Sequence, residues 1–428
     1  MKRKTGGAII LLLLSSVFFF GCTIPDNTAE FWTNIPEITT YADLFNSQQD
    51  QYRIKIVYKE DPGAALLTGT YIPDLIISTN LNSAKYTPYL EDISYFFDPE
   101  KGKVDPAQFY QELLLNGVDN NGVQRTLPVS FNLPLLYYKT GNGITDESDG
   151  LFSNDDLENE VNLFTGKDNF PVRGFSSLWD GHYLYELTKL NGADFHETDS
   201  SLPEWNSEKL NQVLDTIRTA TPPAPPKTEE DEEYPPPGSL EGELAFQEKY
   251  LYQPWFKSVN SGRILYAFTT MEAFYEIPIA EKKSLDIRWI SDGQRVPVCD
   301  DVLYAGILKK GEDKKSAAAF LEWFFQQETQ SAILESSQFK RIRKFGIARG
   351  FSSLYLVNQL EFPRFYSILV GKIPGQRELL FPEILPYSWE EIRKDVIIPW
   401  LRKESIQTEN RLPLEENLRN WYNLRPSL

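Results

Sequence analysis

The chain has 428 residues and a formal net charge of −18, and 41% of its residues are hydrophobic and 14% aromatic. This content excludes a disordered polar chain and indicates well-packed globular domains. The excess of carboxylates would repel a polyanion, so nucleic acid is not an expected partner. The length exceeds one ordinary hydrophobic core, and we therefore expect two domains.

The first residues, MKRKTGGAIILLLLSSVFFFGC, predict an export signal. Three basic residues precede an apolar run from Ala8 to Phe20, which has the length of a signal-peptide core and is short for a membrane span. The run ends in Gly21 and Cys22, and this context resembles a bacterial lipoprotein signal. We expect residues 1–22 to form that signal, with Cys22 carrying the lipid (palmitate) and anchoring the protein at the periplasmic or extracellular face of a membrane. An ordinary secretory signal and an uncleaved anchor stay open.

The next predicted elements form a strand, a helix and a second strand. In 52–58, YRIKIVY, apolar and charged residues alternate as in a half-buried strand. Within 73–79, PDLIIST, residues 75–77 form a short unbroken apolar run, which is typical of a central parallel strand. Residues 62–69 predict a short helix between them that stops at Gly69. This order predicts a βαβ unit in an α/β domain.

The stretch 127–141, LPVSFNLPLLYYKTG, contains SFN and KTG, which look like fragments of a penicillin-binding or β-lactamase site. The SxxK partner of such a site would be Ser337–Lys340, which follows KTG instead of preceding it. SFN and KTG are also too close in sequence to line opposite walls of a site. We therefore interpret residues 133–138 as a structural strand and not as part of an acyl-transfer site.

Residues 222–238, PPAPPKTEEDEEYPPPG, differ from the rest of the chain. Seven of these seventeen residues are proline, and Glu229–Glu233 is an unbroken acidic run. Like charges repel, and proline lacks the N–H group that a sheet needs, so we expect an exposed loop inserted into a domain.

Further on, VLYAGILKK at 302–310 predicts a strand, and 314–334 predicts a helix with Ala317, Phe320, Leu321 and Phe324 on one face.

Motifs for catalysis or cofactor binding are absent from the sequence. The two histidines, His182 and His196, have no common metal-ligand spacing, and there is no P-loop, GxGxxG or G-x-S-x-G. Cys299 is expected to be a small buried residue. Asp300 and Asp301 are neighbours, and neighbouring side chains in a strand point to opposite faces, so a shared catalytic role is not expected. We predict no enzyme activity, no metal and no cofactor.

Several segments occur in a characteristic order. They are FWTNIPE (31–37), GTYIPDLIIST (69–79), LPVSFNLPLLYYKTG, FSSLWDGHYLYELTKLNGADF (175–195), GRILYAFTTM (262–271) and the strand–helix segment 302–330. This series resembles the extracellular solute-binding proteins of ABC importers, in the carbohydrate-type group that includes maltose-binding protein. The resemblance covers nearly all of the chain after the signal.

The resemblance implies a two-lobe α/β fold, the type II periplasmic-binding-protein fold, with crossing strands and a solute between the lobes. It places the first lobe at 23–135 and 291–340 and the second at 136–290 and 341–428, with crossings near 133–137, 288–296 and 336–350. The implied function is a monomeric, lipid-anchored binding component that delivers a solute, a sugar or oligosaccharide, to the permease subunits. A surface lipoprotein that uses this fold as a structural or interaction module stays open, as does a secreted glycosidase.

The resemblance also suggests residues that line the cleft. A sugar site needs aromatic rings for the C–H faces and polar side chains for the hydroxyls. By motif position, the candidates are Trp32, Asn34, Thr79, Asn80, Ser130, Asn132, Trp179, Thr270, Met271, Asp301 and Tyr304. Met271 stands where the family often has a tryptophan, so a different solute, and a pair of lobes that no longer closes, stay open.

Overall fold

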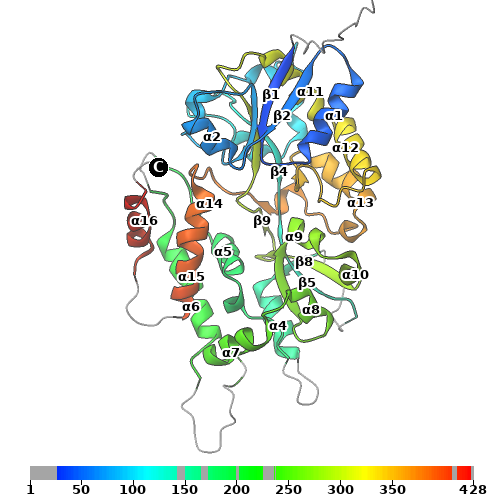
Figure 1. The fold of residues 1–428 in the computed structure, drawn as a ribbon. Coiled ribbons are helices and arrows are strands. Elements are labelled where there is room, and N and C mark those ends of the chain that lie inside the picture. The colour runs from blue at the N-terminus through cyan, green and yellow to red at the C-terminus, as the bar shows by residue number, and fades with distance from the viewer. Residues whose placement is uncertain are drawn as a thin grey trace, which may run out of the picture.

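The structure is a computed structural model, and it describes residues 27–141, 150–164, 172–198, 202–224, 236, 238–406 and 412–425. Two α/β lobes lie end to end, with the N-terminal strands in the upper lobe of Figure 1. The predicted signal segment with Cys22 lies outside the described residues. So does most of the predicted insert 222–238.

The first lobe contains a six-stranded mixed sheet in the order β11-β4-β10-β3-β1-β2. Strands β1, β2 and β3 run parallel, whereas β10 is antiparallel to both β3 and β4. The strands are β1 (Thr28–Thr33), β2 (Arg53–Tyr58), β3 (Leu75–Thr79), β4 (Leu127–Phe131), β10 (Leu303–Ile307) and β11 (Phe351–Ser352). Every residue of β4 and β10 is buried, which is expected for strands covered on both faces.

The helices of this lobe follow local signals in the sequence. Asp61 caps helix α2 by accepting a hydrogen bond from the Ala64 amide at 2.8 Å, and Gly69 ends the helix. The helices are α1 (Ile38–Gln48), α2 (Pro62–Thr68), α3 (Gln111–Leu115), α11 (Lys314–Phe324), α12 (Gln327–Phe339) and α13 (Phe362–Phe365). Ala317, Phe320, Leu321 and Phe324 are buried, so the predicted apolar face of α11 is confirmed.

One sequence prediction for this lobe is confirmed and another needs correction. The predicted strands 52–58 and 73–79 both form, run parallel and are joined by α2, so the βαβ unit is present, with β1 between its two strands in the sheet. The single helix predicted over 314–334 is two helices, because α11 ends at Phe324 and α12 begins at Gln327. Helix propensity is high across this break, and tertiary packing therefore decides where the chain turns.

The second lobe contains a four-stranded sheet in the order β6-β8-β5-β7. Its strands are β5 (Pro134–Lys139), β6 (Leu151–Ser153), β7 (Tyr266–Thr270) and β8 (Leu285–Ser291). The helices around it are α4 (Asn154–Leu163), α5 (Gly181–Leu190), α6 (Ser207–Ala220), α7 (Leu240–Tyr250), α8 (Trp255–Asn260), α9 (Met271–Glu276), α10 (Ile279–Lys282), α14 (Trp389–Ile392), α15 (Ile398–Ile406) and α16 (Leu414–Asn423). The C-terminal helices pack beside α5 and α6 in this lobe (Figure 1).

Two helical segments contain a wider π turn, and each turn comes just before a proline. Arg393–Ile397 joins α14 to α15 and precedes Pro399, and Val357–Glu361 leads into α13 and precedes Pro363. Proline cannot donate an N–H group and clashes with the carbonyl one turn back. A π turn relieves that clash without ending the helix, and such turns are frequent at functional sites.

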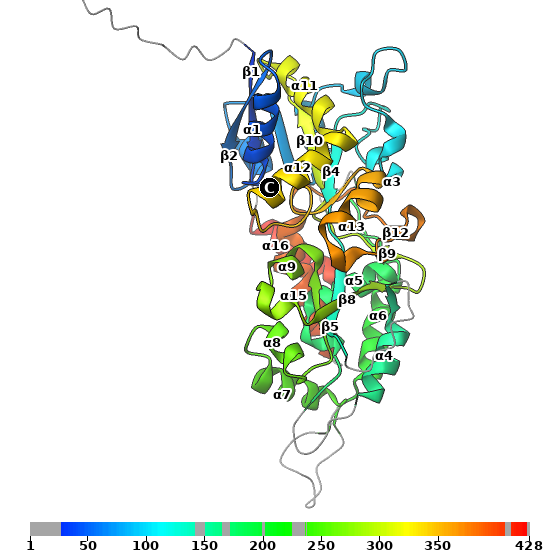
Figure 2. The same ribbon diagram turned by 90° about the vertical axis from the view of Figure 1, so that its right-hand side faces the viewer.

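The chain crosses between the lobes three times. The first crossing lies between β4 and β5, as predicted. The second and third run side by side in a small sheet, in which β9 (Val296–Pro297) pairs in parallel with β12 (Leu379–Leu380) (Figure 2). Because β11 pairs with β4 of the first lobe, the third crossing comes after β11, at β12, and not near 336–350 as predicted. The predicted boundary at 341 therefore assigns β11 and its neighbouring helices to the wrong lobe.

An aromatic seam joins the two lobes beside the crossings. The Trp289 ring of β8 lies 5.9 Å from the Phe351 ring, which stacks on Phe131 of the first lobe at 5.8 Å. The Trp289 indole also donates a hydrogen bond to the Lys372 carbonyl. One continuous apolar core therefore includes residues of both sheets, and a second, smaller core fills the helical part of the second lobe.

Two further observations apply to the described residues only. Their helices are all too short or too polar to cross a bilayer. They also contain no group of three or more histidine, cysteine, aspartate or glutamate side chains that could hold a metal ion.

Candidate functional site

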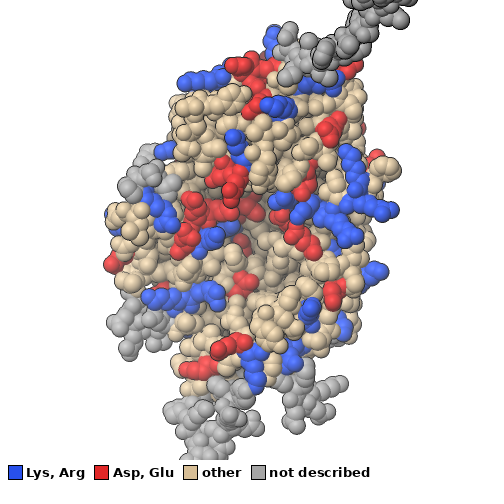
Figure 3. All heavy atoms as spheres, viewed as in Figure 1, with Lys and Arg blue, Asp and Glu red and all other residues tan. Residues whose placement is uncertain are grey.

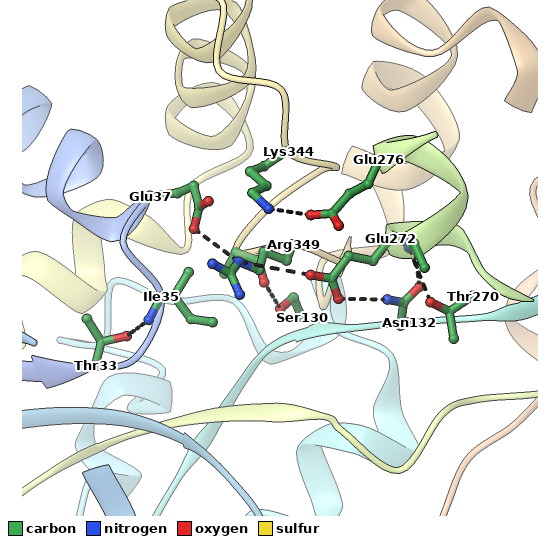
Figure 4. Close-up of polar contacts among 12 residues, drawn as sticks. Thr33, Ile35, Glu37, Ser130, Asn132, Thr270, Glu272, Glu276, Lys344 and Arg349 are labelled. Carbon is green, nitrogen blue, oxygen red and sulfur yellow. Dashed lines mark hydrogen bonds and ion pairs between the residues drawn. The ribbon is translucent and has the colours of Figure 1, made fainter. Parts of the chain in front are cut away.

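Polar side chains from both lobes meet where the crossing segments leave the first lobe (Figure 4). The first lobe contributes the β1–α1 turn, in which the Thr33 hydroxyl accepts a hydrogen bond from the Ile35 amide at 3.0 Å. Glu37 follows at the start of α1. The second lobe contributes Glu272 from the first turn of α9. These groups face each other across the gap between the lobes.

Arg349 lies between these two carboxylates. Its Nε is 3.2 Å from the Glu37 Oε2 and 4.0 Å from the Glu272 Oε1, so one guanidinium interacts with both lobes (Figure 4). Ala348 and Arg349 have φ angles of 45° and 68°, a left-handed conformation that is costly for residues with a side chain. The surrounding structure must hold such a turn in place, and strained residues of this kind are enriched at functional sites.

Buried hydrogen bonds hold that turn. The Ala348 amide donates to the Tyr41 hydroxyl at 3.0 Å, and the Ser130 hydroxyl donates to the Ala348 carbonyl at 3.3 Å. Ser130, a predicted site residue, is therefore buried in β4 and supports the turn that carries Arg349. Further out, Lys344 and Glu276 form a second ion pair between the segments of the two lobes.

Asn132 connects the crossing strands to the second lobe. Its side-chain oxygen accepts hydrogen bonds from the amides of Leu133 at 3.0 Å and Glu272 at 3.3 Å. Its side-chain nitrogen lies 3.5 Å from the Glu272 carboxylate, and its carbonyl accepts from the Cys299 amide at 3.0 Å. The structure thus places this predicted residue at the junction of two crossings, in contact with Glu272.

Glu272 has an unusual electrostatic environment. Burial and the negative charge of Asp301 raise the pKa of its carboxyl group to about 7, against the opposing effect of Arg349. Its side chain is 27% exposed, so it stays partly accessible from the gap. A carboxyl group of this kind can change its charge near neutral pH when a ligand binds beside it.

Asp300 and Asp301 face different surroundings. The Asp300 carboxylate accepts hydrogen bonds from Lys189 Nζ at 2.6 Å, from the Trp389 indole at 2.7 Å and from the Tyr185 hydroxyl. Burial alone would raise its pKa, but Lys189 and Arg393 hold the pKa below its usual value. Asp301 is different: burial raises its pKa, and its Oδ1 has no hydrogen-bond partner among the described residues.

Four other predicted residues are buried in the lobe interiors. Trp179 is 2% exposed and stacks on Phe246 at 5.5 Å, and its indole lies 3.3 Å from the Glu243 carbonyl. Met271 and Tyr304 are also buried. The Trp32 ring is covered by Lys59, whose Nζ lies 4.4 Å from the ring centroid. Their burial leaves little surface for a solute, and Trp179 packs in the large continuous core.

The remaining predicted residues lie near the ends of strands. Asn34 follows β1, and its side-chain oxygen is buried with no partner among the described residues. Thr79 ends β3, and Asn80 follows it with a left-handed φ of 52°. Thr270 caps α9 by accepting a hydrogen bond from the Ala273 amide at 3.3 Å. Their roles in solute binding stay predictions.

The lobes also touch at the outer edge of the gap. The Glu197 carboxylate of the second lobe accepts hydrogen bonds from the Ser83 hydroxyl at 2.8 Å and the Ala84 amide at 3.0 Å. The Tyr86 and Tyr387 rings meet edge to face at 6.2 Å. Figure 3 shows many acidic side chains around the hollow between the lobes and basic side chains to its right.

Sequence reasoning did not find Glu37, Glu272, Lys344 or Arg349. Glu272 directly follows two predicted residues and was missed by one position. No sequence pattern indicated Arg349, because its position between the lobes depends on where the third crossing lies. The left-handed backbone that presents it is not visible in the sequence.

Comparisons with known proteins agree with this geometry. No family model and no curated protein matches the sequence. The sugar-binding protein MalE from Xanthomonas citri superimposes with a TM-score of 0.66 at 11% identity, over 94% of this chain and 98% of that one. The ABC substrate-binding protein of Listeria monocytogenes, solved with cycloalternan, gives 0.61 at 13% identity, over 94% and 100%.

A third solved structure is similar over the same range. The maltotriose-binding protein of Thermus thermophilus gives a TM-score of 0.56 at 10% identity and covers 92% of this chain and 97% of that one. The fold is thus the two-lobe α/β fold of ABC substrate-binding proteins, and the predicted fold class is confirmed. At these identities the likeness establishes the fold, and the ligand must be argued from the site.

Proposed function

We propose that this protein is the solute-binding component of an ABC import system, which captures a sugar-sized solute between its lobes and does not alter it. The main support is the convergence of polar side chains from both lobes and from the crossing segments on one gap. Asn132, Glu272 and Asp301 come from three separate parts of the chain and meet there. A lobe closure at this place would surround a small solute.

The proposal includes delivery to a membrane permease and a lipid anchor at Cys22. Both extend the sequence prediction, and the fold likeness is compatible with them. A Cys22→Ser variant is expected to move the protein from the membrane fraction to the soluble fraction of cells that process lipoproteins. If that variant stays in the membrane fraction, the lipid anchor is wrong.

Thermal melting against a panel of sugars tests the capture of a solute. A ligand present at about 100 times its dissociation constant should stabilise the protein by about 2.7 kcal/mol. Small-angle scattering should show a more compact molecule with the same ligand. An Asn132→Ala variant should lose the melting shift, and an Asn191→Ala variant, altered at the residue that follows α5, should keep it.

A second function is favoured by one specific observation. Arg349 and Glu197 connect the two lobes through the protein's own side chains, and such contacts suit a fold that serves as an interaction module. If no solute shifts the melting temperature and scattering shows no change in size, this second function replaces the first.

A further inference from the structure

The groups that face the gap are mainly hydrogen-bond acceptors with negative charge. Glu37, Glu272, Glu276 and Asp301 contribute carboxylates near the crossings. The basic groups beside them, Lys344 and Arg349, are already in ion pairs with Glu276 and Glu37. A neutral sugar would find few donors here that are not already engaged.

Two buried oxygens in this region point to a missing donor. Asp301 Oδ1 and Asn34 Oδ1 are both buried, and neither has a hydrogen-bond partner among the described residues. Leaving a buried acceptor unpaired is costly, and native structures satisfy most such groups. Asn132 contacts Glu272 with its side chain and accepts a hydrogen bond from the Cys299 amide with its carbonyl, and this holds the segment that carries Asp301 beside Glu272.

Arg393 is the cation that acts most strongly on Asp301, but it does not supply the missing hydrogen bond to Asp301 Oδ1. Arg393 opposes the rise in the Asp301 pKa, but it lies 3.8 Å from the Asp300 carboxylate and also acts on Glu186. Its charge is therefore shared among several buried carboxylates. The charge around Asp301 and Glu272 is left incompletely compensated.

Carboxylates of the two lobes also face each other at the outer part of the gap. Burial and then Asp61 of the first lobe raise the pKa of Glu391 on α14, Arg425 opposes this rise, and Asp395 and Glu390 add to it. Like charges on opposite lobes oppose closure unless a cation lies between them. The acidic side chains around the hollow in Figure 3 agree with this arrangement.

We propose that the natural solute carries protonated amino groups, which bind between Glu272 and Asp301 and supply the donors and the charge that the gap lacks. This inference rests on the proposed function and specifies its solute class. An ammonium group has three donors and no acceptor, which matches a site of closely spaced oxygens. Charge-assisted hydrogen bonds of this kind are stronger than those of a neutral hydroxyl.

A matched pair of sugars tests the amine requirement. The β-1,4-linked disaccharide of glucosamine has two free amines, and its N,N′-diacetyl form has the same ring system without the charges. Isothermal titration should give at least about tenfold tighter binding for the free amine, the ratio expected for one charge-assisted contact. Maltotriose serves as a neutral oligosaccharide, and spermidine as an amine that is not a sugar.

Two substitutions locate the amine. Glu272→Gln and Asp301→Asn should each reduce the preference for the amine by about tenfold, and both remove a charge whose burial is unfavourable, so both should fold. Glu322→Gln is the matched control. Glu322 lies on α11 of the first lobe, where its carboxylate pairs with Lys103 at 2.7 Å and is not among the groups that face the gap. The control should bind as the unaltered protein does.

The pH dependence gives an independent readout. Glu272 is faced by Asp301, Glu276, Arg349, Lys344 and Asn132, and its pKa lies near 7, so a cation must displace its proton below that pH. The affinity for spermidine, whose amines stay protonated, should rise from pH 6 to pH 8. Glu272→Gln should remove most of this rise.

The outcomes separate this inference from the proposed function. Equal or tighter binding of the acetylated disaccharide or maltotriose overturns the amine requirement and leaves solute capture intact. If spermidine binds and the glucosamine disaccharide does not, the amine requirement is supported and the solute class is a polyamine. If neither amine binds at millimolar concentration, the inference is wrong, and the wider sugar panel then decides the proposed function.

Discussion

The two neighbouring aspartates of the second crossing belong to two different charged regions. Asp300 lies in a buried cluster in which Lys189, Trp389 and Tyr185 all donate to it. Asp301 is half-buried, and its buried Oδ1 has no partner among the described residues. The pKa is lowered at Asp300 and raised at Asp301.

This difference separates a structural group from a candidate functional one. Burial penalises both charges, and only the hydrogen-bond donors around Asp300 compensate for it. Both oxygens of the Asp300 carboxylate accept hydrogen bonds, whereas Asp301 Oδ1 accepts none from the described residues. Substitutions in the two regions should therefore change stability in opposite directions.

The largest expected effect is at Asp300. Asp300→Ala leaves Lys189 buried without its main partner, and we expect the free energy of unfolding to fall by about 3–5 kcal/mol. Urea denaturation measures this loss. Asp50→Ala, which removes a fully exposed partner of Arg53, should leave the stability almost unchanged. An Asp300→Ala protein as stable as the control would contradict the assignment of a structural cluster.

Trp179 provides an uncharged reference for the cost of disrupting the second lobe. Trp179→Ala removes an indole that stacks on Phe246, and we expect a loss of about 3–4 kcal/mol. Solute affinity per folded molecule should stay the same. A large loss of affinity at nearly unchanged stability would instead return Trp179 to the binding site.

Glu272→Gln should stabilise the protein at high pH. The folded-state pKa of Glu272 is raised from 4.5 to about 7, so the folded state holds this proton more tightly and stability falls as the pH rises through that window. The penalty is complete above pH 7 and absent below pH 4. Removing the charge should therefore add about 1–2 kcal/mol at pH 8, a value reduced for partial exposure, and nothing at pH 4.

The control for this pH effect is Glu322→Gln, which should not gain stability between pH 4 and pH 8. Melting temperatures across this range provide the measurement. A Glu272→Gln protein that is less stable than the unaltered protein at pH 8 would show that the Glu272 charge is fully compensated.

The smallest expected effect is at Asp301. Asp301→Asn removes a buried charge with an unpaired oxygen, and we expect a gain on the order of 1 kcal/mol at neutral pH. Because the pKa of Asp301 is raised, this gain should decrease as the pH falls toward the ordinary range of an aspartate. Denaturation at two pH values measures this gain. If Asp301→Asn instead lost as much stability as Asp300→Ala, the proposed difference between Asp300 and Asp301 would be wrong.

Much of the fold could be predicted from local patterns. The alternation in 52–58 and the apolar run in 75–79 indicate β2 and β3, and the Pro62–Gly69 signals indicate α2. The order of the motifs led to the two-lobe fold, which the structural comparisons confirm. The third crossing was misplaced because β11 has only two residues and no distinctive pattern.

The candidate site was only partly predictable, because several of its residues have no distinctive local pattern in the sequence. Motif position selected Asn132 and Asp301, which lie in the crossing segments. It also selected Trp179 and Met271, because an aromatic or large apolar residue has the same sequence signal in a core as in a binding site. Arg349 depends on a strained turn held by Tyr41 and Ser130, which are far from it in sequence.

The sequence alone determined the acidic charge, the strand and helix periods and the order of elements, since these depend on residues that are close together in the chain. The tertiary structure decided that Asp300 is surrounded by hydrogen-bond donors and that Asp301 has an oxygen without one among the described residues. That outcome depends on Lys189, Trp389 and Glu272, which come from distant segments. Only the packing of the lobes sets the distances on which burial and Coulomb energies depend.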